Sequence, residues 1–150
     1  HSSYGENNYW SNNFDTLPLF NYKNTLPLWS FEKSTMITMN DKTQKQIKNI
    51  SIGEDTYYGK VRALAKIQIN KSNIYKINNV ITTGDQILKI NGIWFKVSDL
   101  IESNKIEIND NIFYHIIVDT NKLLINNMTF TDFEQYPNYG YLEFNDKSLP

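Results

Sequence analysis

The stretch QILKINGIWFKV, residues 86–97, places two apolar runs on either side of Asn91-Gly92. Ile, Leu, Trp, Phe and Val suit strands, whereas Asn-Gly readily adopts the left-handed backbone that a two-residue hairpin turn requires. The stretch therefore predicts a β-hairpin. The chain on both sides of it repeats the same pattern, with short apolar runs separated by turns rich in Asn, Asp, Gly and Thr.

These strand-like runs extend over most of the chain. Besides the hairpin, they cover residues 35–39, 46–50, 60–70, 74–77, 80–82, 112–118, 123–125 and 128–130. Apolar and polar residues alternate in the longest runs, as expected for strands with one buried face. No convincing amphipathic helix occurs, and residues 98–103 are expected to form one short turn. The pattern predicts an all-β domain of many short antiparallel strands.

The composition excludes several classes of protein. The formal net charge of the 150 residues is −1, so the chain lacks the basic excess of a duplex nucleic-acid binder. No apolar run is long enough to cross a bilayer, and no signal peptide is visible, so we expect no membrane partner and favour an intracellular or virion-associated protein. Cysteine is absent and the histidines are His1 and His115, so we expect neither a metal site nor a cofactor.

Residues 1–29 differ in character from the rest of the chain. They are rich in Asn, Tyr and Trp, and they contain TLPLF at residues 16–20 and TLPLW at residues 25–29. Each proline lacks an amide donor and favours an extended backbone in the residue before it. We therefore expect an extended N-terminal arm that lies on a surface through its apolar side chains, which are Trp10, Phe14, Leu19, Phe20 and Trp29.

Several blocks that follow the arm occur in the order and spacing of a known family. SFEKSTMI (residues 30–37) resembles its opening block, in which a nucleophile precedes Phe and a Thr-x-Ile strand follows. The later blocks are matched by residues 46–54, 80–99 and 113–134. Residues 30–135 thus resemble the Hint fold of hedgehog processing domains and inteins, in the non-splicing form found in large viruses and protists. This resemblance implies a Hint-like domain at 30–135, followed by a tail at 136–150.

The resemblance also implies a reaction. In this family the first residue of the domain attacks the preceding carbonyl carbon and forms an ester or thioester. Ser30 would then be the nucleophile, Trp29–Ser30 the scissile bond, and the N-terminal segment the substrate. The Thr-x-x-His block of the family corresponds to Thr82 and Asp85, and its later histidine to Asn121.

These positions depart from the family's pattern. Serine needs stronger activation than the usual cysteine, and an aspartate is an anion near neutral pH that cannot donate a proton unless burial neutralises it. The His-Asn ending that splicing requires is absent. We therefore expect self-cleavage by an N-to-O acyl shift that is inactive or impaired. Natural degeneration and deliberate inactivation both explain the departures, and we favour the first; whether the chain is an enzyme stays open.

Other roles remain open for the same residues. Ser30, Asp85 and Asn121 all suit turns, Thr82 suits a strand, and His115 suits packing within the strand at 112–118. One alternative function is a non-enzymatic structural module of a larger assembly such as a virion, with the arm docked on another subunit or on its own sheet edge. Another is a carbohydrate-binding module that uses the abundant aromatic residues.

Overall fold

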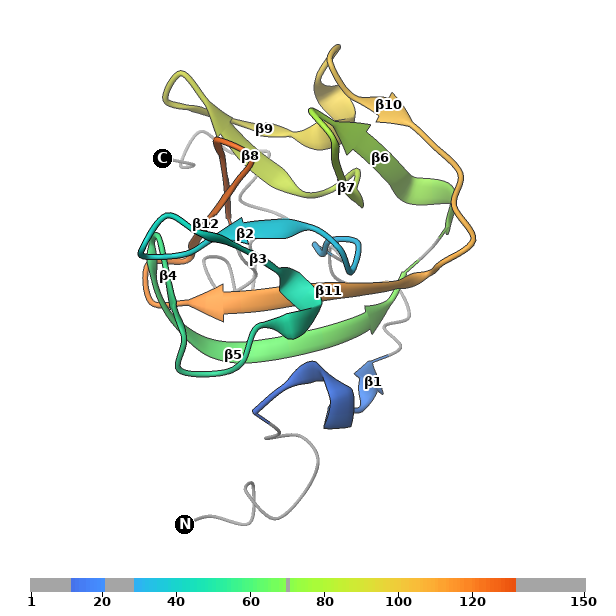
Figure 1. Ribbon diagram of the computed structural model, residues 1–150. Coiled ribbons are helices and arrows are strands. Elements are labelled where there is room, and N and C mark those ends of the chain that lie inside the picture. Colours follow the sequence, from blue (N-terminus) through green and yellow to red (C-terminus); the bar gives the residue numbers. More distant parts are fainter. Residues whose placement is uncertain (1–11, 21–28, 70, 132–150) are drawn as a thin grey trace.

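Strands make up most of the regular structure in this computed structural model, which describes residues 12–20, 29–69 and 71–131 (Figure 1). The helical segments of this described part are single 3-10 turns: η3 (Phe14–Thr16), η4 (Ile47–Asn49), η5 (Lys71–Asn73) and η6 (Val97–Asp99). The all-β class expected from the sequence is confirmed.

The strands pair in four groups, most of them antiparallel. One group holds β1 (Leu19–Phe20), β4 (Asp55–Thr56), β5 (Gly59–Gln68) and β11 (Ile112–Val118). A second has the order β10 (Asn104–Lys105), β6 (Ile74–Ile77) and β7 (Val80–Thr83). A third has the order β12 (Lys122–Ile125), β13 (Met128–Thr131), β8 (Ile87–Ile90) and β9 (Ile93–Lys96), and β2 (Met36–Thr38) pairs with β3 (Gln44–Gln46).

The long strands β5 and β11 run side by side through the domain, with β1 on one side of the pair and the hairpins β6–β7 and β8–β9 on the other (Figure 1). They run antiparallel, with Ile112 opposite Gln68 at one end and Val118 opposite Val61 at the other. The register shifts between Ile117 and Val118, which is the signature of a β-bulge. On β11 the side chains of Phe113 and His115 are both fully buried.

Three hairpins use the same turn chemistry. The central residues of the β6–β7, β8–β9 and β12–β13 turns all have positive φ, namely Asn78-Asn79, Asn91-Gly92 and Asn126-Asn127. Positive φ at both central positions defines the turn type that fits the twist of paired strands, and asparagine and glycine tolerate it best. The hairpin predicted at Asn91-Gly92 is confirmed.

The strand expected at residues 46–50 is wrong. The chain leaves β3 at Gln46 and forms the 3-10 turn η4, in which the Ile50 N–H donates to the Ile47 carbonyl at 3.1 Å. A 3-10 turn has three residues per turn, so Ile47 and Ile50 lie on one side, and both are fully buried. The same device follows β9, where η6 occupies part of the turn expected at residues 98–103.

The apolar interior has two clusters. The larger includes Phe31, Ile37, Leu88, Ile116 and Phe130, and the smaller gathers around Ile67 and Phe113. Phe14 and Leu17, which precede the strands, belong to the larger cluster. These two residues of the expected arm are therefore packed into the domain.

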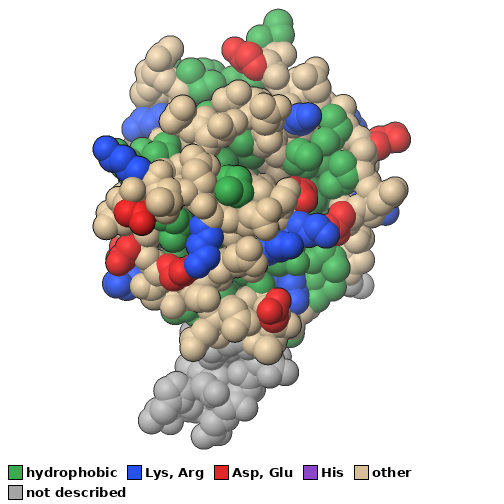
Figure 2. Space-filling view, viewed as in Figure 1, with side chains coloured by type: hydrophobic (Ala, Val, Ile, Leu, Met, Phe, Trp, Pro, Cys, Tyr) green, Lys and Arg blue, Asp and Glu red, His purple; other side chains and the backbone are tan. Residues whose placement is uncertain are grey.

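Charges on the surface are mixed. On the face shown in Figure 2, acidic and basic side chains are interspersed and neither sign forms a continuous patch. This agrees with the formal net charge of −1 for the whole chain. Within the described residues, no helix has the length and apolar character needed to cross a bilayer.

Candidate functional site

The Trp29–Ser30 junction lies inside the domain. Trp29, Ser30 and Phe31 are 1%, 0% and 0% exposed. Phe31 forms antiparallel bridges with Thr82 of β7 on one side and with Tyr114 of β11 on the other. The Phe31 N–H donates to the Tyr114 carbonyl at 2.8 Å, and the Tyr114 N–H donates to the Phe31 carbonyl at 2.7 Å. The chain just after the junction therefore runs between two strands and joins their sheets.

Thr82 and Ser30, two of the residues that the sequence singled out, are in contact. The hydroxyl of Thr82 donates to the Ser30 carbonyl at 2.6 Å, and both residues are fully buried. A buried hydrogen bond of this length fixes the orientation of the acceptor peptide. Thr82 thus holds the backbone of the candidate nucleophile, while its part in a reaction stays a prediction.

Asp85 has different surroundings. It follows β7, and its side chain is 42% exposed. Its carboxylate accepts a hydrogen bond from the Asn73 amide at 3.3 Å and lies 4.0 Å from the Lys96 ammonium group. In this arrangement the Asp85 carboxylate is a hydrogen-bond acceptor, and its expected role in a reaction remains a prediction.

Asn121 lies in the turn between β11 and β12. Its φ is 62°, and its N–H donates to the Val118 carbonyl at 3.0 Å. Asparagine is enriched in this left-handed region, so the turn itself explains the residue. Its expected role in place of a histidine remains a prediction.

The sequence placed His115 correctly within the strand at 112–118, but did not reveal which residues lie across the sheet from it. Phe31 and Tyr114 form an isolated antiparallel bridge, and extending that pairing by one residue sets Ser30 opposite His115 on β11. The bridge from Phe31 to Thr82 likewise sets Ser30 opposite Thr83 on β7. All three side chains are buried, with exposed fractions of 0% for Ser30 and His115 and 1% for Thr83. The signal in the sequence was that His115 is the one histidine outside the N-terminal segment.

Burial dominates the chemistry of His115. It lowers the pKa of the imidazole from 6.5 to about 3, because an apolar interior penalises the charged form. The ring lies parallel to that of Phe31, with 6.3 Å between centroids. His115 is therefore neutral near pH 7, with one ring nitrogen able to accept a hydrogen bond.

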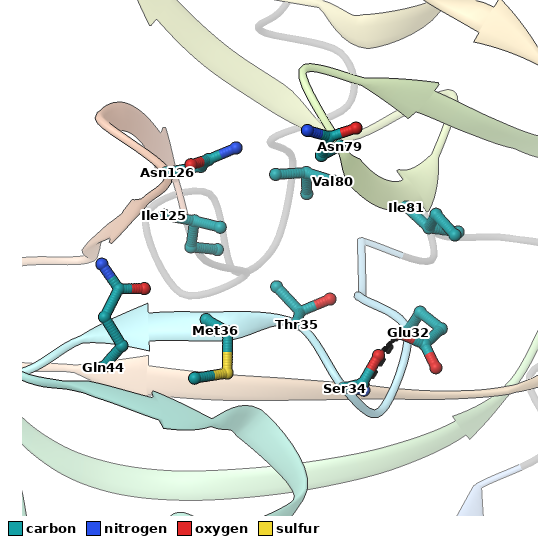
Figure 3. A pocket seen from close by; sticks show the side chains of 10 residues that line it. All are labelled: Glu32, Ser34, Thr35, Met36, Gln44, Asn79, Val80, Ile81, Ile125 and Asn126. Carbon is teal, nitrogen blue, oxygen red and sulfur yellow. Dashed lines mark hydrogen bonds between the residues drawn. The ribbon is translucent and has the colours of Figure 1, made fainter.

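A cavity of about 320 Å³ lies between β2, β7 and β12, and neither Trp29 nor Ser30 lines it (Figure 3). Glu32, two residues beyond Ser30, lines it together with Ile81 of β7 and Met36 of β2. The Glu32 carboxylate accepts hydrogen bonds from the backbone and hydroxyl of Ser34. The remaining wall is mostly amide, hydroxyl and aliphatic, and the described residues contain no group of three His, Cys, Asp or Glu that could hold a metal ion.

The segment before the junction is held on β5 and β11. Phe14 packs edge-on against Tyr114, with ring centroids 4.9 Å apart, and its carbonyl accepts from Lys66 at 3.0 Å. Strand β1 runs parallel to β5, with Leu19 opposite Lys66. Residues 14–20 are thus anchored to β5 and β11, and the chain just after the candidate bond is anchored to β11 and β7.

The comparisons with known proteins do not assign this chain to a family. No family model and no curated protein matches the sequence. Among solved structures, the chain is similar to a DnaB intein from Synechocystis sp. PCC 6803, with a TM-score of 0.47 and 12% sequence identity. The match covers 69% of this chain and 98% of the intein chain.

Proposed function

We propose that this chain is a Hint-type self-cleaving domain whose N-to-O acyl shift at Trp29–Ser30 is inactive or impaired. The observation that carries the proposal is the buried setting of Ser30. The residue is fully buried, the chain after it is paired with both β7 and β11, and the Thr82 hydroxyl holds its carbonyl. A surface turn between an arm and a domain would need none of these contacts.

The reaction uses atoms that are already adjacent in the chain. The Ser30 hydroxyl oxygen attacks the carbonyl carbon of Trp29, the carbon–nitrogen bond breaks, and the proton lost by the hydroxyl reaches the freed amine. The product is an ester between Trp29 and the Ser30 side chain. Water or added hydroxylamine then cleaves that ester. Holding the backbone in one conformation favours such an intramolecular attack over reactions with solvent.

Impairment follows from Asp85. The resemblance expects a proton donor at this position, yet the carboxylate is paired with Lys96 and partly exposed. A serine hydroxyl is also less nucleophilic near neutral pH than the usual cysteine thiolate. Both departures slow the acyl shift without changing the path of the chain.

A second candidate is a purely structural role for the N-terminal segment. Phe14, Leu17 and Trp29 are almost fully buried, and β1 adds to β5 as a parallel edge strand. This favours docking of the segment on its own sheet, which is one form of the interaction-module hypothesis. Docking of the arm on a partner subunit is the other form of that hypothesis.

The test is the intact mass of the purified chain under denaturing conditions, before and after a day with hydroxylamine at neutral pH. Denaturation is essential because the N-terminal segment would stay packed on β5 and β11 after cleavage. We expect a slowly accumulating species that begins at Ser30, its absence in Ser30→Ala, and faster accumulation in Asp85→His.

The proposal fails if the parent chain, Asp85→His and Ser30→Cys all keep their full mass. The structural role of the segment would then stand as the better account. Melting curves of the same variants must show that each one is folded under the conditions of the assay.

A further inference from the structure

We infer that His115 is the hydrogen-bond and proton partner of Ser30, and that it supplies the acid–base function that Asp85 does not. The inference rests on the proposed function and names a residue for it. It is carried by strand register, burial and space around the imidazole.

The register is the first argument. Phe31 and Tyr114 exchange both backbone hydrogen bonds, so the neighbouring pair, Ser30 and His115, is of the non-hydrogen-bonded kind. Side chains of such a pair point to the same face, with β-carbons about 4.5–5.5 Å apart. That separation brings a serine hydroxyl within reach of an imidazole nitrogen.

The space around the ring is the second argument. On its other side, β11 pairs with β5, and the residue opposite His115 there is Ala65. A small side chain at this position leaves room for the imidazole beside the junction. The Phe31 ring lies parallel to the imidazole, with 6.3 Å between the ring centroids. The imidazole therefore lies between a small residue and Ser30.

Thr83 gives a third, independent observation. Its hydroxyl is buried and has no hydrogen-bond partner among the described residues, and the register places it opposite Ser30 from the β7 side. Buried hydroxyls are normally satisfied, so an unsatisfied one beside a reactive bond calls for an explanation. We assign it as a donor to the oxyanion that forms on the Trp29 carbonyl during attack.

The proton balance is simple. The imidazole nitrogen takes the proton of the Ser30 hydroxyl as the oxygen bonds to the Trp29 carbonyl carbon. The ring passes the same proton to the Ser30 nitrogen as the carbon–nitrogen bond breaks, so the charged imidazole, which burial disfavours, does not accumulate. His115 ends neutral, the peptide has become an ester with a free amine, and no other reactant is consumed.

The first test is a change of nucleophile. The rate of appearance of the hydroxylamine-cleaved species is measured for His115→Asn in two backgrounds, the parent chain and Ser30→Cys. A base matters less to a thiol, which ionises more readily than a hydroxyl. We expect a loss of about 100-fold in the parent chain and of less than about 10-fold in the Ser30→Cys background. Equal losses in the two backgrounds would mean that His115 only supports the fold, and would overturn the inference.

Thr83 has its own matched control. Thr131 is another buried threonine whose hydroxyl lacks a hydrogen-bond partner among the described residues, and it lies on β13. Thr83→Val should slow cleavage about 10-fold or more, whereas Thr131→Val should leave the rate within about two-fold of the parent chain. Equal rates for these two variants would remove Thr83 from the site.

The second test needs no turnover and separates the inference from the proposed function. Nitrogen-15 NMR of the folded chain resolves few imidazoles, since the sequence has 2 histidines. We expect the His115 ring signals to move in Ser30→Ala and to stay unchanged in Thr131→Val. If they move while no variant cleaves, the contact stands and the proposed function fails. If they do not move, the inference fails, even where cleavage occurs.

Discussion

The short segment 82–85 is buried at one end and partly exposed at the other. Its buried end is Thr82-Thr83, and its exposed end is Asp85. The threonines end β7 inside the domain, with exposed fractions of 0% and 1%, and both lie against the Ser30 junction. Asp85 comes after the strand ends, and its side chain is 42% exposed beside Lys96. The comparison teaches that neighbouring residues of one segment can have separate tasks. Thr82 holds the backbone at Ser30, whereas Asp85, which the resemblance offers as the proton donor, faces a cation and solvent.

Among the changes that test this comparison, removal of the Phe31 ring should have the largest effect on stability. Phe31 is fully buried and packs edge-on against Phe130 at a centroid distance of 5.2 Å. Phe31→Ala should lower the free energy of unfolding by about 3–5 kcal/mol, through lost burial and the cavity left behind. Urea unfolding followed by tryptophan fluorescence measures it.

Ile101→Ala is the control for that measurement, because Ile101 is 94% exposed and should change the stability by less than about 0.5 kcal/mol. A small effect for Phe31→Ala as well would mean that the junction is only loosely held between β7 and β11. The junction would then be held no more tightly than the exposed turn at Asp85.

The next largest effect is the dependence of the unfolding free energy on pH that His115 contributes. Its pKa in the folded chain is about 3, below the ordinary 6.5, so between these values the unfolded chain binds a proton that the folded chain does not. Stability from this group is intact above about pH 6.5 and falls as the pH drops towards 3, by up to about 1.4 kcal/mol per pH unit. Urea unfolding of the parent chain and of His115→Gln at several pH values isolates the contribution as a difference.

That difference in unfolding free energy should be flat above pH 7 and should shrink as the solution is acidified. A difference that stays constant from pH 7 to pH 5 would contradict the burial of a neutral imidazole. Such a result would mean that the His115 side chain is solvated, as that of Asp85 is.

The smallest effect is expected at Asp85 itself. Its ion pair with Lys96 is long, at 4.0 Å, and both side chains are about 40% exposed. Exposed pairs of this kind contribute little, so Asp85→Asn should change the unfolding free energy by less than about 0.5 kcal/mol, and less still in high salt. A double-mutant cycle with Lys96→Met checks this. A coupling above about 1.5 kcal/mol would show that the Asp85 turn is as tightly held as the junction.

Part of the site could be predicted from local sequence alone. Ser30 and Thr82 were singled out from short blocks, and the structure brings them within hydrogen-bond distance. His115 could not be placed in the same way. A lone histidine within a strand has no local feature that tells a packing residue from a reactive one. Its neighbour across the sheet is set by register, which depends on how distant segments pair.

The sequence by itself determined the all-β class and the hairpin at Asn91-Gly92, because left-handed backbone at two successive residues is a local property of asparagine and glycine. It also limited which residues could react, since cysteine is absent and histidine is scarce. Only the tertiary structure decided that the junction lies between β7 and β11, with Ser30 opposite His115 and Asp85 beside Lys96. The physical reason is that burial and register arise from pairing between segments far apart in the chain, which no short stretch encodes.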